Sequence, residues 1–115
     1  MSTQLGTIGE TVVKLEFLRK GFEVYTGDDN TYLDFIVRDI KKGRLSKVEV
    51  KTTTRRNKNN TGWIVDIRRS YGDLPFEKEN LDILAVYLEP IDRVKIFDAN
   101  KIELKSMMTI LDTEL

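Results

Sequence analysis

Two segments with period-two alternation, separated by a turn that contains glycine, constrain the fold of this chain more than any other feature. In "LDFIVR" (Leu33 to Arg38) and "SKVEVKT" (Ser46 to Thr52), apolar residues largely alternate with polar or charged ones. This alternation is typical of half-buried β-strands. The "KKG" within the intervening "DIKKGRL" favours a hairpin turn. The sequence therefore predicts an antiparallel hairpin with one apolar and one polar face.

The register of this hairpin follows from the position of its turn. A turn centred between Lys41 and Lys42 places Asp34 directly opposite Glu49 on the polar face, with the two Cβ atoms roughly 5 Å apart. A slip of one residue would move the apolar set into water, so the pattern itself supports this register. The apolar face then comprises Leu33, Phe35, Val37, Val48 and Val50. The polar face comprises Asp34, Ile36, Arg38, Lys47, Glu49 and Lys51.

Two opposed carboxylates on one sheet face repel each other unless a cation lies between them. A divalent metal is one candidate, and Lys51 on the same face could place its ammonium beside a metal-bound water or a phosphate. A structural salt bridge among Asp34, Glu49, Lys47 and Lys51 is the alternative. The chain has neither cysteine nor histidine, so any metal site must use oxygen ligands, which favour magnesium or manganese.

Glu10 is a third acid in an unusual setting. On a helical wheel it falls with Gly6, Val13 and Phe17, and an acid among such neighbours is costly to bury unless it has a cation. Gly6 and Gly9 each cost about 1 kcal/mol in a helix interior, and their missing side chains would let the helix approach a sheet closely. The alternative is an ordinary acid that the N-terminal helix dipole favours.

The rest of the chain predicts a mixed α/β fold. We expect one mixed sheet flanked by helices, in a single domain over residues 1–115. The expected helices are Gln4 to Lys20 and, as one of two interpretations beside a capping segment, a short helix within residues 100–111. "YGDLPFEKEN" (residues 71–80) is expected to form a loop or short helix. Further strands are expected at Phe22 to Tyr25, Gly62 to Arg69, Leu81 to Glu89 and Arg93 to Ala99, with the third buried on both faces.

Charge is unevenly distributed along a chain whose formal net charge is zero. Eleven bases and three acids lie between Arg38 and Arg69, a local charge of +8. This segment is either a surface that binds a polyanion or a solvated hairpin. Within it Trp63 is expected in the core, and Asp82, in the later buried strand, is expected to be a satisfied structural acid. An apolar run of about 18 residues and a signal-peptide pattern are both absent, so we expect a cytoplasmic, intracellular protein without a membrane partner.

The order "GTIGE", "YLDFIV" and "VEVK" resembles the PD-(D/E)XK nuclease superfamily over about residues 6–89. The stretch that begins at "VEVKTTTRR" is most similar to group I intron-associated endonucleases, and "GxxGE…EVK" is also similar to archaeal-type Holliday junction resolvases. The resemblance implies a restriction-endonuclease-like core. Leu33 stands where the superfamily motif has proline.

The resemblance also implies roles for individual residues. Asp34 and Glu49 would be metal ligands, Lys51 the catalytic lysine, and Glu10 an additional acid that holds or tunes the metal. The implied cofactor is Mg²⁺, with Mn²⁺ as a substitute. The expected DNA contacts are Lys41, Lys42, Arg44, Arg55, Arg56, Lys58, Arg68 and Arg69.

The resulting hypothesis is a magnesium-dependent DNA endonuclease that acts on branched or duplex DNA. A structure-selective Holliday junction resolvase that works as a homodimer of bare cores is the main interpretation, because 115 residues leave no room for a separate domain that reads sequence. A homing or restriction-type site-specific endonuclease is the first alternative. The second is a nucleic-acid-binding protein that has the nuclease fold but no catalysis.

Overall fold

One helix and seven strands make up the regular part of the described chain, which we analysed as a computed structural model. The structure describes residues 3–26, 34–67, 81–103 and 106–115. Helix α1 (Thr3–Arg19) is followed by β1 (Phe22–Thr26), β2 (Phe35–Asp39), β3 (Leu45–Thr53), β4 (Gly62–Asp66), β5 (Ile83–Leu88), β6 (Arg93–Asp98) and β7 (Met107–Leu111). Two short 3₁₀ turns, η2 (Glu89–Ile91) and η3 (Asp112–Glu114), follow β5 and β7.

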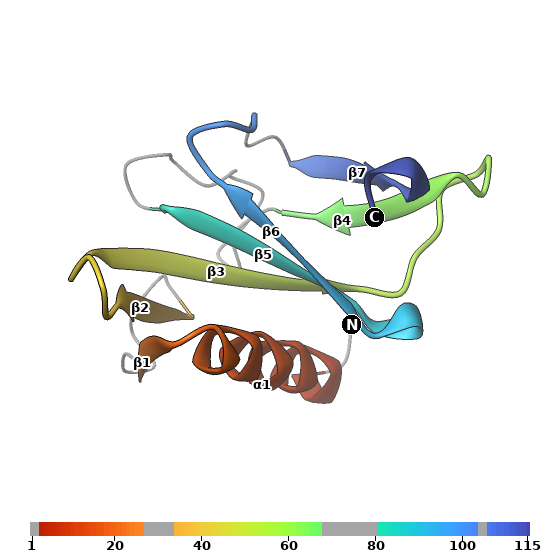
Figure 1. The fold of residues 1–115 in the computed structure, drawn as a ribbon. Coiled ribbons are helices and arrows are strands. Elements are labelled where there is room, and N and C mark those ends of the chain that lie inside the picture. The colour runs from red at the N-terminus through yellow and green to blue at the C-terminus, as the bar shows by residue number, and fades with distance from the viewer. Residues whose placement is uncertain (1–2, 27–33, 68–80, 104–105) are drawn as a thin grey trace.

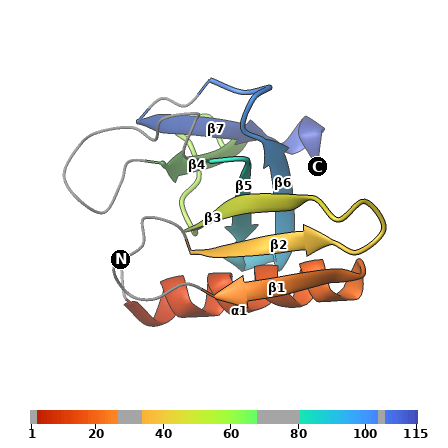
Figure 2. The same cartoon turned by 90° about the vertical axis from the view of Figure 1, so that its left-hand side faces the viewer.

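These elements form three layers. A five-stranded sheet has the order β1-β2-β3-β5-β6, and β4 pairs with β7 in a separate two-stranded sheet. Figures 1 and 2 show that α1 covers one face of the larger sheet, while the β4–β7 pair lies on the opposite side. The mixed α/β fold that the sequence predicts is therefore confirmed.

Each interface between layers holds its own apolar cluster. The cluster between α1 and the main sheet is built around Val13, Phe17, Phe35, Val37 and Val48. The cluster on the β4–β7 side contains Trp63, Val65, Ile67, Leu81 and Ile110 among its members. Strand β5 contributes to both clusters with alternate residues, so it is the central strand buried on both faces that its sequence predicts.

The predicted hairpin register is confirmed. Phe35 pairs with Val48 and Val37 with Ser46, as a turn centred between Lys41 and Lys42 requires. The turn is closed by a 2.9 Å hydrogen bond from the backbone N–H of Asp39 to the carbonyl of Arg44. Gly43 has a φ of 67° there, a left-handed conformation that glycine adopts without strain.

The C-terminal segment differs from one of its two interpretations. Residues Met107–Leu111 form strand β7, which pairs with β4, and not a helix. Met108 and Ile110 alternate with Met107 and Thr109, and this alternation places Met108 and Ile110 against the apolar cluster on the β4–β7 side. The segment therefore caps the apolar cluster, as the other interpretation held. The pair of β4 and β7 adds a second small sheet to the expected single mixed sheet.

Strand β3 has an unequal environment along its length, and this positions the site. On one edge, β5 pairs with it in parallel from Val48 to Thr53. On the other edge, β2 pairs with it only from Leu45 to Val48. Within the described ranges, the second half of β3 therefore has no strand on that edge. In the same part of the chain, no helix is long and apolar enough to span a membrane.

Candidate active site

Asp34 lies at the point where β2 ends its pairing with β3. Its Oδ2 accepts a 2.6 Å hydrogen bond from the backbone N–H of Val50, the residue between Glu49 and Lys51. The side chain thus takes the place of the next backbone partner in the ladder. Because this bond anchors Asp34 to β3, its carboxylate is held beside the acid and the lysine of the same strand.

Glu49 and Lys51 form a largely buried pair on the face of β3 opposite to α1. Glu49 is only 6% exposed, and its Oε1 lies 3.7 Å from the Nζ of Lys51. Its other oxygen, Oε2, is buried and accepts no hydrogen bond in the described structure. A buried carboxylate oxygen without a partner is costly, and this cost marks the position as one that a ligand or cation would satisfy.

Burial raises the pKa of Glu49 to about 9, and the neighbouring carboxylate of Asp34 adds to this effect. Lys51 lowers the pKa of Glu49, but its effect is smaller than the combined effect of burial and acidic neighbours. A simple salt bridge would instead lower the pKa of its carboxyl group. Lys51 does contact Glu49, as the salt-bridge alternative predicts. This contact is not enough, however, to bring the pKa of Glu49 down to its ordinary value.

Glu10 reaches the same cluster from α1. Burial raises its pKa to about 7, and a hydrogen bond with the Asp34 side chain contributes to the rise. The turn of α1 that carries Glu10 packs closely on β3 because Gly9, its neighbour, is buried against Thr52. The alternative interpretation, an ordinary acid favoured by the N-terminal helix dipole, predicts a lowered pKa for Glu10 and not the raised one.

The donor set fits a hard divalent cation. Asp34 contacts both Glu10 and Glu49, and the pKa values of these two glutamates are raised. Neutralising such a cluster is what a Mg²⁺ or Mn²⁺ ion with carboxylate ligands does. In the described ranges, however, no group of three acidic side chains is placed to hold one ion together. Asp34 and Glu49, the predicted ligands, lie next to each other, and Glu10 lies next to Asp34; their roles as metal ligands stay predictions.

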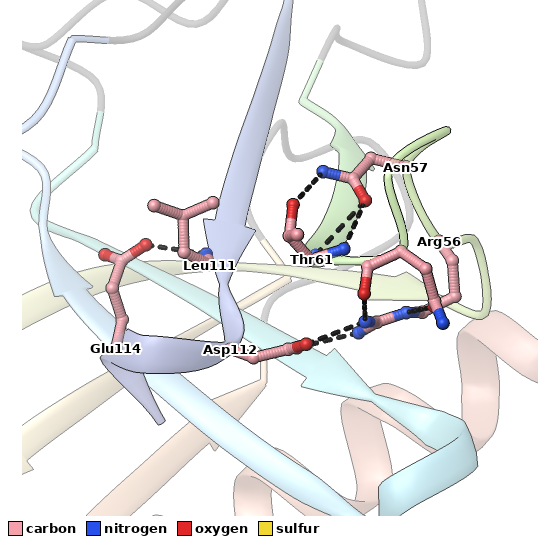
Figure 3. Close-up of polar contacts among 8 residues, drawn as sticks. Arg56, Asn57, Thr61, Leu111, Asp112 and Glu114 are labelled. Carbon is pink, nitrogen blue, oxygen red and sulfur yellow. Dashed lines mark hydrogen bonds and ion pairs between the residues drawn. The ribbon is translucent and has the colours of Figure 1, made fainter.

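Arg56, a predicted DNA contact, is committed to contacts within the chain. Its Nη1 and Nη2 each lie 2.7 Å from an oxygen of Asp112 (Figure 3). Its Nε donates a hydrogen bond to Oδ1 of Asn60. The guanidinium also lies 4.6 Å from the centre of the Trp63 ring. Trp63 itself is 5% exposed and belongs to the core, as predicted. The ion pair between Arg56 and Asp112 connects the β3–β4 loop to the C-terminal turn.

The same loop is closed by the side chain of Asn57. Its Oδ1 accepts a hydrogen bond from the backbone N–H of Thr61, and its Nδ2 donates to Thr61 Oγ1 (Figure 3). Its Oδ1 also accepts from the backbone N–H of Gly62. On the neighbouring turn, the backbone N–H of Leu111 donates to Glu114 Oε2 at 2.7 Å. Both segments that Arg56 and Asp112 join are therefore locally ordered by their own hydrogen bonds.

The other predicted DNA contacts are distributed over two exposed places. Lys41, Lys42 and Arg44 lie at the turn between β2 and β3, whereas Arg55 and Lys58 lie beyond the end of β3. Arg68 and Arg69 lie outside the described residues, as do Leu33 and the segment 71–80. No observation tests these residues as DNA contacts, so they stay predictions.

Asp82 is a structural acid, as predicted. Its Oδ2 accepts a 2.8 Å hydrogen bond from the backbone N–H of Lys47, and its own N–H donates to the Lys47 carbonyl at 3.0 Å. These two hydrogen bonds therefore join the first part of β3 to the residue that precedes β5. Strand β5 begins only at Ile83, so Asp82 precedes the strand and does not interrupt it, although the sequence predicts a strand from Leu81 to Glu89.

A groove beside the acid cluster was not foreseen from the sequence. It has a volume of about 490 Å³ and runs from Lys51 along the end of β3 toward β4. Its lining consists of Leu5, Lys51, Thr52, Thr53, Thr54, Arg55, Ile64 and Asp66. Only the alternation in β4, which places Ile64 and Asp66 on the face opposite to Trp63, hints at it in the sequence.

Comparison with solved structures identifies the architecture. The chain matches the bacterial homing endonuclease I-Ssp6803I with a TM-score of 0.75, over 96% of this chain and 76% of that one, at 24% sequence identity. The chain has a restriction-endonuclease-like fold. No family model matches the sequence, and no curated protein matches it.

Proposed function

We propose that this protein is a metal-dependent DNA endonuclease whose active site comprises Asp34, Glu49 and Lys51, with Glu10 as an accessory acid. The observation that carries the proposal is the buried Glu49 carboxylate, whose Oε2 has no hydrogen-bond partner and whose pKa is raised to about 9 although Lys51 is adjacent. The restriction-endonuclease-like fold supports it.

In this proposal, each residue of the site has a different role in phosphodiester hydrolysis. Asp34 and Glu49 would hold Mg²⁺ or Mn²⁺, which supplies an acidified water and neutralises charge on the phosphoryl group when bound. Asp34 is kept in place by the Val50 backbone N–H, so it holds its orientation before a metal arrives. The Nζ of Lys51 lies 3.7 Å from Oε1 of Glu49, where it can orient a nucleophile or stabilise the charge that develops on phosphorus.

Glu10 has a supporting role in this proposal. Its carboxyl group bonds to Asp34, so it can hold a proton near neutral pH or receive one from the site. Its position on α1 couples the packing of the helix to the geometry of the acid cluster. The assignment of Glu10 as a direct metal ligand stays a prediction.

For the substrate, we favour site-specific cleavage of duplex DNA over resolution of Holliday junctions. One solved structure that the chain matches is that of a homing endonuclease, which corresponds to the first alternative drawn from the sequence. The homodimer and the intracellular location stay predictions. Catalysis on this fold is favoured over a purely binding role because the acid and lysine positions are intact and lie together.

The decisive experiment is a cleavage assay with magnesium or manganese on a library of linear duplexes and, in parallel, on a four-way junction with matched arms. We expect metal-dependent cleavage that is lost in Asp34→Asn and Glu49→Gln, both of which keep the size of the side chain. Cleavage confined to particular duplex sequences would favour the site-specific type, and cleavage confined to the junction would favour a resolvase. Equal activity of both variants and the wild type would refute the assigned site.

A further inference from the structure

The groove of about 490 Å³ begins at Lys51, so it opens directly from the candidate active site. It exists because β2 stops pairing with β3 at Val48, which leaves the second half of β3 without a strand on that edge in the described ranges. The N-terminal part of α1 contributes Leu5 to one wall, and β4 contributes Ile64 and Asp66 to the other.

The groove has a charge gradient along its length. Lys51 and the exposed Arg55 provide cations on the β3 side, while the exposed carboxylate of Asp66 lies on the β4 side. A phosphate is attracted to the first side and repelled by the second. Between them, the half-buried Ile64 and Leu5 offer apolar surface.

The wall that carries Arg55 is held rigidly. The backbone N–H of Arg55 donates to Thr53 Oγ1 at 3.1 Å, and Thr53 Oγ1 donates to the carbonyl of Ile64 at 2.6 Å. The N–H of Ile64 in turn donates to the carbonyl of Arg55 at 2.9 Å. These bonds fix the spacing between the two walls, so the groove does not need to be built when a ligand binds.

We propose that this groove is a nucleotide subsite, which holds the nucleotide next to the cleaved bond with its phosphate at Arg55 and its sugar and base edge toward Ile64 and Asp66. The inference rests on the proposed nuclease function. Arg55 acts as a phosphate clamp, and Ile64 packs against the sugar. Asp66 accepts a hydrogen bond from an exocyclic amino group on the major-groove edge, which gives the groove a preference for cytosine or adenine over guanine or thymine at that position.

The test uses two charge changes in the groove, each with a matched control. Arg55→Ala is compared with Arg19→Ala, which removes the same charge at the exposed far end of α1, about 21 Å along the helix from Leu5. Thr54→Glu is compared with Thr113→Glu, which adds the same charge to the exposed turn η3. All four positions are exposed, so the fold is expected to persist.

Binding of labelled duplexes is measured by fluorescence anisotropy in EDTA, which separates binding from cleavage, and cleavage is measured with magnesium. We expect Arg55→Ala to weaken binding about fivefold near 0.15 M salt and to reduce the salt slope by about 0.9. Thr54→Glu should weaken binding further, and Asp66→Ala should abolish the base preference beside the cut. The two controls should match the wild type.

The outcomes separate this inference from the proposed function. If the wild type cleaves DNA while Arg55→Ala and Thr54→Glu match their controls, the subsite is refuted and the nuclease assignment stands. If the wild type binds DNA through the groove but cleaves nothing with either metal, the nuclease assignment is refuted, and the groove stands only as a nucleotide-binding site with no cleaved bond beside it. A wild type that neither binds nor cleaves DNA overturns both.

Discussion

Gly9 of α1 packs directly on Thr52 of β3. A Cβ atom built at Gly9 would overlap with Thr52 Oγ1 and lie 3.1 Å from its Cβ. The contact brings the helix close enough to β3 for Glu10, the next residue, to reach Asp34. Glycine at this position therefore connects helix packing with the geometry of the acid cluster.

Substituting Gly9 by alanine should separate α1 from β3. Thr52 is β-branched and buried, so its side chain has little freedom to yield, and we expect a loss of about 1–3 kcal/mol in unfolding free energy. Urea unfolding measures this loss. Gly6→Ala is the control because, apart from the adjoining helix backbone, no heavy atom of the described residues lies within 4 Å of a Cβ built at Gly6. The better helix propensity of alanine should stabilise the protein by up to about 1 kcal/mol. Equal effects of the two substitutions would contradict the packing argument.

The sequence predicted the close approach of α1 but not which glycine causes it. Gly6 and Gly9 look equivalent in the sequence, since both lie in the first half of the helix. Only the rotation of α1 about its axis, which the apolar residues Val13 and Phe17 determine by packing on the sheet, decides that Gly9 faces Thr52. Such a rotation is a tertiary property that periodicity gives only approximately.

The acid cluster predicts an unusual dependence of stability on pH in metal-free protein. Glu49 has a pKa of about 9 and Glu10 a pKa of about 7 in the folded state, and both ordinarily ionise near 4.5. The folded state thus retains protons that the unfolded state releases above pH 4.5. The stabilisation that results is fully present below that pH and is lost as the pH rises through 7 toward 9.

The measurement is the urea midpoint in EDTA at pH 5, 7 and 9. We expect it to fall across this range for the wild type and to fall much less for Glu49→Gln, which cannot ionise. Magnesium should restore part of the lost stability at pH 9 in the wild type only. A wild-type midpoint that rises between pH 5 and 9 would contradict the raised pKa values of Glu49 and Glu10 in the folded protein.

Lys51→Ala should reduce the cleavage rate while metal binding persists. An ammonium is not a metal ligand, so its loss removes transition-state stabilisation, and we expect a decrease of about 10²- to 10³-fold in the single-turnover rate. Manganese affinity by calorimetry should change little. If that affinity is instead lost, Lys51 acts by holding Glu49 in place across their 3.7 Å contact and not on the reaction.

The acid cluster was within reach of the sequence because it depends on one register. The pairing of Phe35 with Val48 places Asp34 next to Glu49, and the alternation together with the position of the turn specifies that pairing. The groove could not be predicted from the sequence, because it depends on where β2 stops pairing with β3 and on how β4 crosses the end of β3. The hydrogen bonds between Arg56 and Asp112 join residues 56 positions apart, and the local sequence carries no signal for them.

The last prediction concerns this ion pair and the basic loop that precedes β4. Arg55, Arg56 and Lys58 look alike in the sequence, but Arg56 hydrogen-bonds to Asp112 and holds the pKa of that carboxyl group below its usual value. Its charge is therefore already balanced inside the protein. The double variant Arg55→Ala/Lys58→Ala should reduce the slope of log affinity against log salt by about 0.9 for each lost phosphate contact.

Adding Arg56→Ala to that double variant should leave the slope unchanged while it lowers the melting temperature, because the loop from Asn57 to Thr61 loses its tie to the C-terminal turn. Lys101→Ala, an exposed change at the start of the segment after β6, serves as the control and should alter neither quantity. A further reduction of the slope by about 0.9 in the triple variant would show that Arg56 releases Asp112 and contacts a phosphate when DNA binds. An unchanged slope in the double variant would mean that this loop is only a solvated surface, and DNA binding would then depend on the turn between β2 and β3.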